Sequence, residues 1–248
     1  MSALTYALLS ALIISFLSLI GILSLAISDK FLNKILILLV SLSAGSLMGG
    51  AFFHLIPETL TECRNFLSPS VYILTGFCVF FMLERILRWH HCHKIGCEIH
   101  PPLGHLNLVG DGVHNIIDGL VIIAAFTISP KLGIPVALSI AFHEIPQEIG
   151  DFGVLLYAGF KKSKALFYNF LTALSVILGV ILGYFLLGRI ESVNQFLLPF
   201  AAGSFIYIAA SDLIPELHKE INLAKSLLIF LIFLIGLILM LGLKLLGE

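Results

Sequence analysis

Eight stretches of this chain are long and apolar enough to cross a lipid bilayer as helices. A bilayer contains roughly 30 Å of hydrocarbon, and a helix needs about 20 residues to span it. Of all residues, 59% are hydrophobic and only 12% are charged, a balance far more apolar than that of a soluble domain. The predicted spans are 4–27, 34–57, 69–88, 105–128, 133–157, 165–188, 194–215 and 223–246. Because the connectors are too short for another domain, residues 1–248 are predicted to form one all-α, polytopic domain in the lipid bilayer.

Charge and cysteine content argue against other classes of protein. A formal net charge of -1 and the lack of a basic run longer than Lys161-Lys162 leave no surface for nucleic acid. The cysteines are scattered, which argues against a disulfide scaffold. No basic residue precedes the first apolar run, and no small-residue cleavage pattern ends it before Asp29. That run is therefore interpreted as a retained helix and not as a signal peptide.

The distribution of Lys and Arg predicts the orientation, because cytoplasmic loops accumulate these residues. The loops after the first, third, fifth and seventh spans contain Lys30, Lys34, Arg85, Arg88, Lys94, Lys161, Lys162, Lys164, Lys219 and Lys225. The opposite side contains Arg64, Lys131, Arg189 and Lys244. The predicted topology has both termini outside, in the plasma membrane of a prokaryote.

An internal repeat relates the two ends of the chain. Residues 44–58 (AGSLMGGAFFHLIPE) and 202–216 (AGSFIYIAASDLIPE) align without a gap and are identical at eight of fifteen positions. The two copies lie in the second and seventh spans, which cross the membrane in opposite directions. Inverted repeats of this kind are typical of secondary transporters. The first three spans are therefore predicted to repeat as the last three, around a central pair formed by spans four and five; chance similarity between two Gly/Ala-rich helices is the alternative.

Span 105–128 contains polar groups that a lipid-facing helix does not tolerate, since an ionisable side chain at the bilayer centre costs about 3 kcal/mol or more. Asn107, Asp111, His114 and Asp118 follow one another at steps of four, three and four, which places them on one helical stripe. Asn115 flanks this stripe. The stripe is therefore predicted to face protein, water or an ion.

Span 133–157 has a matching set of polar side chains. His143, Gln147 and Asp151 form one helical row, and Glu144 and Glu148 lie in the neighbouring row. The two spans are antiparallel and their polar groups fall near mid-helix, so the groups are predicted to meet at one depth. A lone intramembrane polar residue is as often a packing residue, but a set of carboxylates without Lys or Arg favours a cation.

The donor types indicate which cation. Imidazole nitrogen combined with carboxylate oxygen suits zinc and also iron, manganese, cobalt or nickel, whereas calcium and magnesium favour oxygen alone. Pro146 is predicted to free the backbone carbonyl of Phe142 beside the ion path. Local weakening of span 105–128 is predicted at three glycines, namely Gly110, Gly112 and Gly119.

Residues 114–119 (HNIIDG) and 143–151 (HEIPQEIGD) resemble the signature helices of the ZIP family, the Zrt- and Irt-like metal transporters. The HLIPE segment at 54–58, the eight spans and the outward termini resemble the same family. The resemblance implies uptake of Zn²⁺, with Fe²⁺, Mn²⁺ or Cd²⁺ as alternatives, into the cytoplasm through a site between the fourth and fifth spans. It is also compatible with a homodimer.

The resemblance also implies two sets of ligands. The primary site consists of His114, Asp118, His143 and Gln147. A second site would use Asn115, Glu144 and shared carboxylates, with Glu148 among them. Many members of the family read HExPHE where this chain has Gln147, so an amide replaces an imidazole at that position.

Further polar residues are predicted along the pathway. His54 and Glu58 lie toward the outer end of the second span, and their repeat partners Asp212 and Glu216 lie toward the inner end of the seventh. Asp111 and Asp151, with Asn107, are predicted to relay the ion inward. A His- and Cys-containing loop at about 89–104 is interpreted either as a transient zinc-capture segment or as a polar linker.

Two other functions compete with transport. His143-Glu144 begins like the HExxH motif of metalloproteases, but the second histidine of that motif is missing. A non-transporting metal sensor is the other alternative. The chain has no nucleotide-binding motif, so the predicted mechanism is alternating access, in which spans four and five move against the inverted repeats without ATP.

Overall fold

The computed structural model describes residues 2–21, 29–62, 67–89, 101–187 and 193–247, and all regular structure within them is helical. The elements in chain order are α1 (Ala3–Leu17), η1 (Ser18–Ile20), α3 (Asp29–Gly49), η2 (Gly50–Leu55), α4 (Ile56–Glu62), α5 (Leu67–Trp89), α6 (Pro101–Ile128), α7 (Pro130–Tyr157), α8 (Lys162–Ala173), α9 (Ser175–Leu187), α10 (Val193–Tyr207), η3 (Ile208–Leu213), α11 (Ile214–Leu217) and α12 (Leu223–Gly247). Within the described residues, each predicted span coincides with one helix or with a continuous series of helices; residues 22–27 and 188 of the predicted spans lie outside them. The predicted His/Cys loop lies largely outside the described residues.

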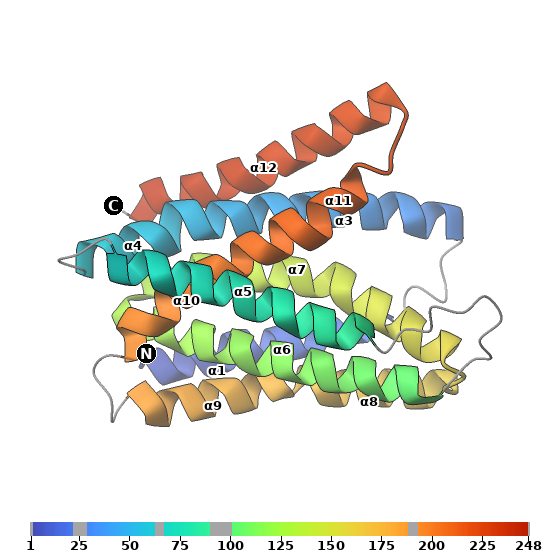
Figure 1. Ribbon diagram of the computed structural model, residues 1–248, viewed down its shortest axis with the longest axis horizontal. Helices are drawn as coiled ribbons and strands as arrows, with labels where there is room; N and C mark the ends of the chain where they lie inside the picture. Colours follow the sequence, from blue (N-terminus) through green and yellow to red (C-terminus); the bar gives the residue numbers. More distant parts are fainter. Residues whose placement is uncertain (1, 22–28, 63–66, 90–100, 188–192, 248) are drawn as a thin grey trace.

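Seven of the helical stretches in the described ranges are long and apolar enough to cross a membrane. Helix α7 has the length for an eighth, at 28 residues, but it contains Glu144, Glu148 and Asp151, which make it too polar by composition. Glu144 and Glu148 are buried and Asp151 is partly buried, and α7 itself lies in the middle of the bundle (Figure 1). The prediction of an all-α, polytopic membrane protein is therefore confirmed.

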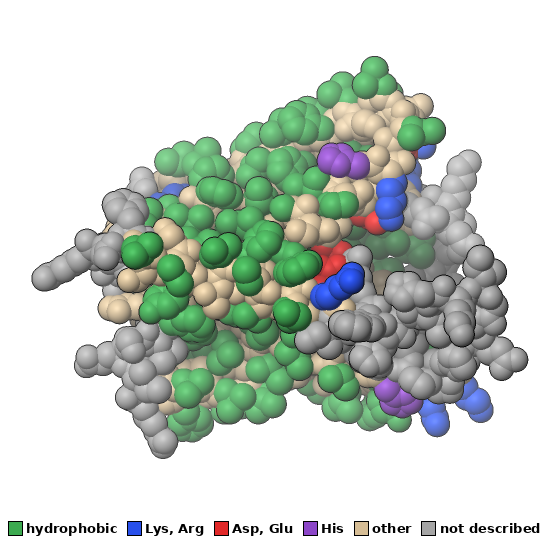
Figure 2. All heavy atoms as spheres, in the orientation of Figure 1, with side chains coloured by type: hydrophobic (Ala, Val, Ile, Leu, Met, Phe, Trp, Pro, Cys, Tyr) green, Lys and Arg blue, Asp and Glu red, His purple; other side chains and the backbone are tan. Residues whose placement is uncertain are grey.

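The helices run roughly along one common direction, and the N- and C-termini lie at the same end of the bundle (Figure 1). Helix α12 borders the bundle and leans away from it. Apolar side chains cover the middle of the face seen in Figure 2, whereas charged side chains show mainly near its right-hand end. An apolar surface of this extent is what contact with the bilayer interior requires.

The internal repeat appears in the structure as two π-helical turns. The turn η2 covers Gly50–Leu55 and η3 covers Ile208–Leu213, so the two occupy equivalent positions of the repeat. Each lies just before an Ile-Pro pair, at Pro57 and Pro215. A proline inside a helix lacks an N–H group and clashes with a preceding carbonyl, and a wider turn in front of it makes room for its ring.

Equivalent glycines bring two helix pairs into close contact. A Cβ atom on Gly45 of α3 would lie 2.1 Å from the carbonyl oxygen of Phe233 on α12, and one on Gly203 of α10 would lie 1.8 Å from that of Ile73 on α5. Gly45 and Gly203 are repeat partners. The pairs α3–α12 and α10–α5 therefore cross at corresponding points, as an inverted repeat predicts.

Helix α6 is continuous through Gly110, Gly112 and Gly119, and local weakening at these glycines stays a prediction. Gly119 allows close packing, since a Cβ atom there would lie 2.1 Å from the carbonyl oxygen of Val176 on α9. Around this contact α6 buries Val121, Ile122 and Ile123. The helix is held by this tertiary packing, which outweighs the low helix propensity of glycine.

Candidate metal centre

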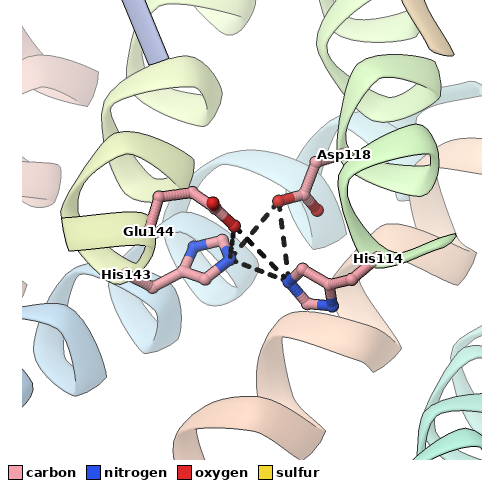
Figure 3. A group of neighbouring side chains, drawn as sticks. All are labelled: His114, Asp118, His143 and Glu144. Carbon is pink, nitrogen blue, oxygen red and sulfur yellow. Dashed lines mark hydrogen bonds and ion pairs between the residues drawn. The ribbon is translucent and has the colours of Figure 1, made fainter. Parts of the chain in front are cut away.

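Helices α6 and α7 form a tight hairpin that brings their polar midpoints together. Ser129 is the only residue between them, and its hydroxyl group accepts a hydrogen bond from the backbone N–H of Leu132, which caps the start of α7. Because the helices continue in opposite directions from this turn, His114 and Asp118 of α6 lie opposite His143 and Glu144 of α7 (Figure 3).

The four side chains each direct one atom to a common point (Figure 3). The Nε2 atoms of His114 and His143 are 3.1 Å apart. From His143 Nε2, the Asp118 Oδ2 atom is 3.3 Å away and the Glu144 Oε1 atom 3.4 Å away. From His114 Nε2, the same two oxygens lie at 3.7 and 3.8 Å. All four residues are buried.

The carboxylates in this cluster lack conventional partners. Asp118 Oδ2 and both Glu144 carboxylate oxygens are buried without a hydrogen bond. Among the residues that the structure describes, no Lys or Arg forms an ion pair with either carboxylate. Removing a carboxylate from water costs several kcal/mol unless an opposite charge compensates. Two imidazoles and two carboxylates around one point supply the ligand set that zinc prefers.

The surroundings fix how the two imidazoles point. Nδ1 of His143 lies 3.2 Å from the backbone carbonyl of Ser139; as a carbonyl can only accept, Nδ1 carries the proton and Nε2 presents its lone pair to the cluster. The ring of Phe80 packs edge-on against His114, at 5.5 Å between centroids. The ring of Phe205 lies against His143. These aromatic rings place apolar groups against both imidazoles.

A second group of carboxylates adjoins the first. One oxygen each from Asp111, Glu144 and Glu148 lie within 4.8 Å of one another, so Glu144 belongs to both groups. Asn115 donates from its Nδ2 atom to Asp111 Oδ1 at 2.9 Å. Asp111 Oδ2, Glu148 Oε1 and the Asn115 amide oxygen are buried without a hydrogen bond. This second group offers oxygen ligands only.

Gln147 lies on the side of the second group. Its Nε2 atom donates to Asp111 Oδ1 at 3.2 Å, because an amide donor finds a carboxylate acceptor there. Glu144 lies with Asp118 and the two imidazoles in the group of four, and a place for Gln147 beside them stays a prediction. Metal binding by any of these residues remains a prediction.

The predicted pathway residues lie at varied positions. Asn107 donates to Asp151 at 3.0 Å, on the side of the second group, and Asp151 is close enough to Asp212 for an electrostatic interaction. Glu216 is exposed and forms an ion pair with Lys219. Asp212 is exposed as well.

At the opposite end, His54 is only 2% exposed, and its Nε2 atom lies 2.9 Å from the carbonyl oxygen of Met240 on α12. Glu58, one turn further on, is partly buried. The structure therefore brings neither residue to the imidazole cluster.

The Phe142 carbonyl, predicted to be freed by Pro146, has a partner in another helix. The hydroxyl group of Ser43 on α3 donates a hydrogen bond to it. Because a buried carbonyl without a partner is unfavourable, a small hydroxyl side chain opposite the proline is the simplest solution. This hydrogen bond thus joins α7 to α3.

Sequence analysis missed a third helix beside these carboxylates. Asn169 of α8 is buried and donates to a carboxylate oxygen of Glu148. Thr172 of the same helix lies beside Asp111, and Ser175, the first residue of α9, donates to the carbonyl of Gly112 at 2.9 Å. The signal was present in the sequence, as these three residues follow at intervals of three in an otherwise apolar run.

Comparison with known proteins relates most of the chain to metal transporters. Residues 90–244 match a family model described as ZIP Zinc transporter. The chain is similar to the zinc transporter zipt-7.1 of Caenorhabditis briggsae, with 30% identity over 243 residues that cover 74% of this chain and 62% of the relative. It is also similar to the zinc transporter ZIP13 of Pongo abelii, with 31% identity over 219 residues that cover 82% and 65%.

The zinc transporter YKE4 of Saccharomyces cerevisiae is another relative, 29% identical over 213 residues that cover 74% of this chain and 62% of its own length. The chain thus spans between 62% and 65% of the length of these relatives. All three are eukaryotic proteins, so they give no support to a prokaryotic plasma membrane.

Proposed function

Since the chain belongs to the ZIP zinc transporter family, we propose that it carries a divalent transition metal, first of all Zn²⁺, across its membrane into the cytoplasm. The named relatives are zinc transporters and not proteases, which supports transport over the metalloprotease alternative. The metal is cargo, bound at mid-membrane by His114, Asp118, His143 and Glu144.

One observation carries this proposal, namely the convergence of two imidazole nitrogens and two carboxylate oxygens within 4.8 Å of one another. A transported ion needs ligands that replace its hydration shell in the middle of the membrane. These buried carboxylates need a cation to compensate their charge. Both requirements are met when one divalent ion binds between α6 and α7.

The inverted repeat supports alternating access as the mechanism. At equivalent repeat positions, His54 is buried whereas Asp212 is exposed. This asymmetry fits a state that is closed near His54 and open near Asp212. In the opposite state of the transport cycle, the end near His54 would be open and the end near Asp212 would be closed. The hairpin α6–α7 would move against a scaffold that contains the close pairs α3–α12 and α10–α5.

The inward route runs from the imidazole cluster through oxygen ligands alone. After the group of Asp111 and Glu148, the Asn107–Asp151 pair and then Asp212 provide successive carboxylates. These groups have no imidazole ligands, so they should bind Zn²⁺ more weakly than the mixed nitrogen and oxygen site. The ion can therefore leave that site toward them. The excess of Lys and Arg in the loops at this end supports its placement in the cytoplasm.

Metal uptake into proteoliposomes tests the proposal. Zn²⁺, Fe²⁺, Mn²⁺ and Cd²⁺ are compared for the wild type, His114→Ala and Asp118→Ala, with His218→Ala as the matched control because it removes an exposed imidazole outside the cluster. Uptake should fall to the level of empty vesicles in the first two variants and stay unchanged in the control. Unchanged uptake in His114→Ala and Asp118→Ala contradicts the site.

A further inference from the structure

The start of helix α8 carries three lysines without acidic neighbours. Lys161, Lys162 and Lys164 are all exposed, and together they are called the basic patch. Among the residues that the structure describes, none of the three forms an ion pair. The sequence explains this, because it contains no Asp or Glu between Asp151 and Glu191. The positive charge of the patch is therefore not compensated within this part of the chain.

The basic patch lies at the end of a membrane-spanning stretch. The stretch formed by α8 and α9 runs from Lys162 to Leu187, so the lysines are at its first turn. Basic side chains are visible at this corner of the molecule, at the right-hand end of α8 (Figure 1 and Figure 2). The ends of a span lie at the depth of the lipid headgroups, outside the hydrocarbon. The patch is therefore at the level where lipid phosphate groups are found.

One face of α8 continues from the patch into the apolar surface. Lys164, Phe167 and Leu171 follow one another at steps of three and four, which places them on the same helical face. Phe167 is 60% exposed and Leu171 is 51% exposed, and Lys164 is exposed as well. The opposite face buries Ala165 and Asn169 in the bundle. The exposed face thus presents an ammonium group, an aromatic ring and an aliphatic chain in the order in which a phospholipid presents its headgroup and its acyl chains.

Aromatic rings hold the start of α8 against its neighbours. The ring of Phe160 packs against Tyr168 of α8, with 5.8 Å between centroids, and against His105 of α6, at 5.3 Å. Phe167 packs against Tyr168 at 5.7 Å. Aromatic side chains are enriched where the hydrocarbon meets the headgroups. The patch is therefore part of a packed surface at that depth.

We propose that the basic patch binds the headgroup phosphate of an anionic phospholipid, one acyl chain of which lies along Phe167 and Leu171. Charge complementarity selects this partner, because each lysine close to the membrane surface strengthens the binding of anionic lipid by about fivefold. A lipid without net charge would leave the lysines uncompensated. The inference does not depend on the metal centre, since it uses none of the residues of that centre.

Other lysines at this end of the bundle provide the contrast. Lys219 forms an ion pair with Glu216, and Lys225 forms one with Glu220. These pairs flank the connection from α11 to α12, at the opposite edge of the bundle from α8 (Figure 1). Because their charges are already compensated, they are not expected to select an anionic lipid.

Native mass spectrometry of the purified full-length protein in detergent measures lipid binding. Dioleoyl-phosphatidylglycerol is compared with dioleoyl-phosphatidylcholine, which has the same acyl chains and no net charge. Three lysines should make the wild type bind the anionic lipid about 100-fold more tightly. Lys162→Gln combined with Lys164→Gln should reduce this preference to about fivefold. Lys162→Arg combined with Lys164→Arg should retain it, because arginine keeps the charge.

The matched control is Lys219→Gln combined with Lys225→Gln, which also removes two positive charges and should keep the preference of the wild type. Phe167→Ala combined with Leu171→Ala tests the acyl chain. This variant should weaken the binding of both lipids to the same extent, since the two lipids differ only in the headgroup. All of these side chains are exposed, so the Tm of each variant should stay close to that of the wild type.

Several results would overturn the proposal. Equal affinities of the wild type for the two lipids, or an unchanged preference after Lys162→Gln with Lys164→Gln, would show that the patch does not select the headgroup. An equal loss in the Lys219 and Lys225 control would show a general effect of charge. Unchanged binding after Phe167→Ala with Leu171→Ala would place the acyl chains elsewhere. Displacement of the lipid by an equal concentration of inorganic phosphate would show a site for soluble anions.

Discussion

Replacing Gly203 with alanine tests the close crossing of α10 and α5. The added Cβ atom would lie 1.8 Å from the carbonyl oxygen of Ile73, whereas ordinary van der Waals contact begins at 3.4 Å, so the helices must separate by about 1.6 Å (3.4 minus 1.8). A gap of 0.5–1 Å already removes a quarter to a half of the dispersion energy of each contact. The obstacle is a backbone atom and cannot rotate away. We therefore expect Gly203→Ala to lower the free energy of unfolding by about 3 kcal/mol, the upper end of the range for overpacked sites.

Thermal unfolding in detergent measures this cost. For a chain of this size each kcal/mol shifts Tm by about 2–4 °C, so Gly203→Ala should lower Tm by about 6–12 °C. The matched control is Gly242→Ala on α12, where an added Cβ atom meets nothing within 4 Å, and its Tm should stay the same or rise slightly. Gly45→Ala, the repeat equivalent, should resemble Gly203→Ala. Equal Tm values for Gly203→Ala and Gly242→Ala would refute the reasoning.

Three further predictions concern access, selectivity and helix contact. A cysteine at Asp212, which is exposed, should react with a water-soluble thiol reagent at least about tenfold faster than one at His54, which is buried, as expected when the reactive group is accessible; equal rates contradict the asymmetry between the ends. Gln147→His should raise the binding preference for Zn²⁺ over Mn²⁺ about tenfold, since imidazole suits zinc better than an amide oxygen does, and unchanged relative affinities argue against a nearby ion. Ser43→Ala should destabilise the protein by about 1–3 kcal/mol in thermal unfolding because it leaves the buried carbonyl of Phe142 without a donor; an unchanged Tm would show that water replaces the hydroxyl group.

Hydropathy was sufficient to predict the spans, because a bilayer imposes length and apolarity directly on the sequence. The exception is instructive. The apolar residues around the HEIPQE segment predict α7, yet with Glu144 and Glu148 in its middle it is not among the seven stretches that are apolar enough to cross a membrane by composition. It is a membrane helix only because the rest of the bundle surrounds it, which is information about tertiary structure.

Helical spacing was sufficient to locate the candidate ligand residues. It was not sufficient to predict which of their side chains lie next to one another. Spacing placed His114, Asp118, His143 and Gln147 at one depth. It could not show whether Glu144 or Gln147 turns toward the imidazoles, since the two lie on adjacent rows of α7 and side-chain rotation decides. The contact of Asn169 was missed for another reason, because a short row of small polar residues in an apolar run does not show which helix it faces.

The prolines in the sequence predict where a helix is disturbed, but they do not predict how the structure accommodates the disturbance. At Pro57 and Pro215 the preceding turn widens into a π-helix, whereas at Pro146 the helix continues and a hydroxyl group from Ser43 satisfies the freed carbonyl. The same local defect thus has two solutions. Which one occurs depends on the neighbouring helix, which a single segment does not reveal.

Zinc K-edge X-ray absorption of the zinc-loaded protein tests the central claim most directly. With one equivalent of Zn²⁺, the wild type should show two imidazole nitrogens at about 2.0–2.1 Å and carboxylate oxygens, without sulfur. His143→Ala should lower the imidazole count by one. Sulfur ligands, or an imidazole count that His143→Ala leaves unchanged, would show that zinc binds elsewhere and would contradict the account.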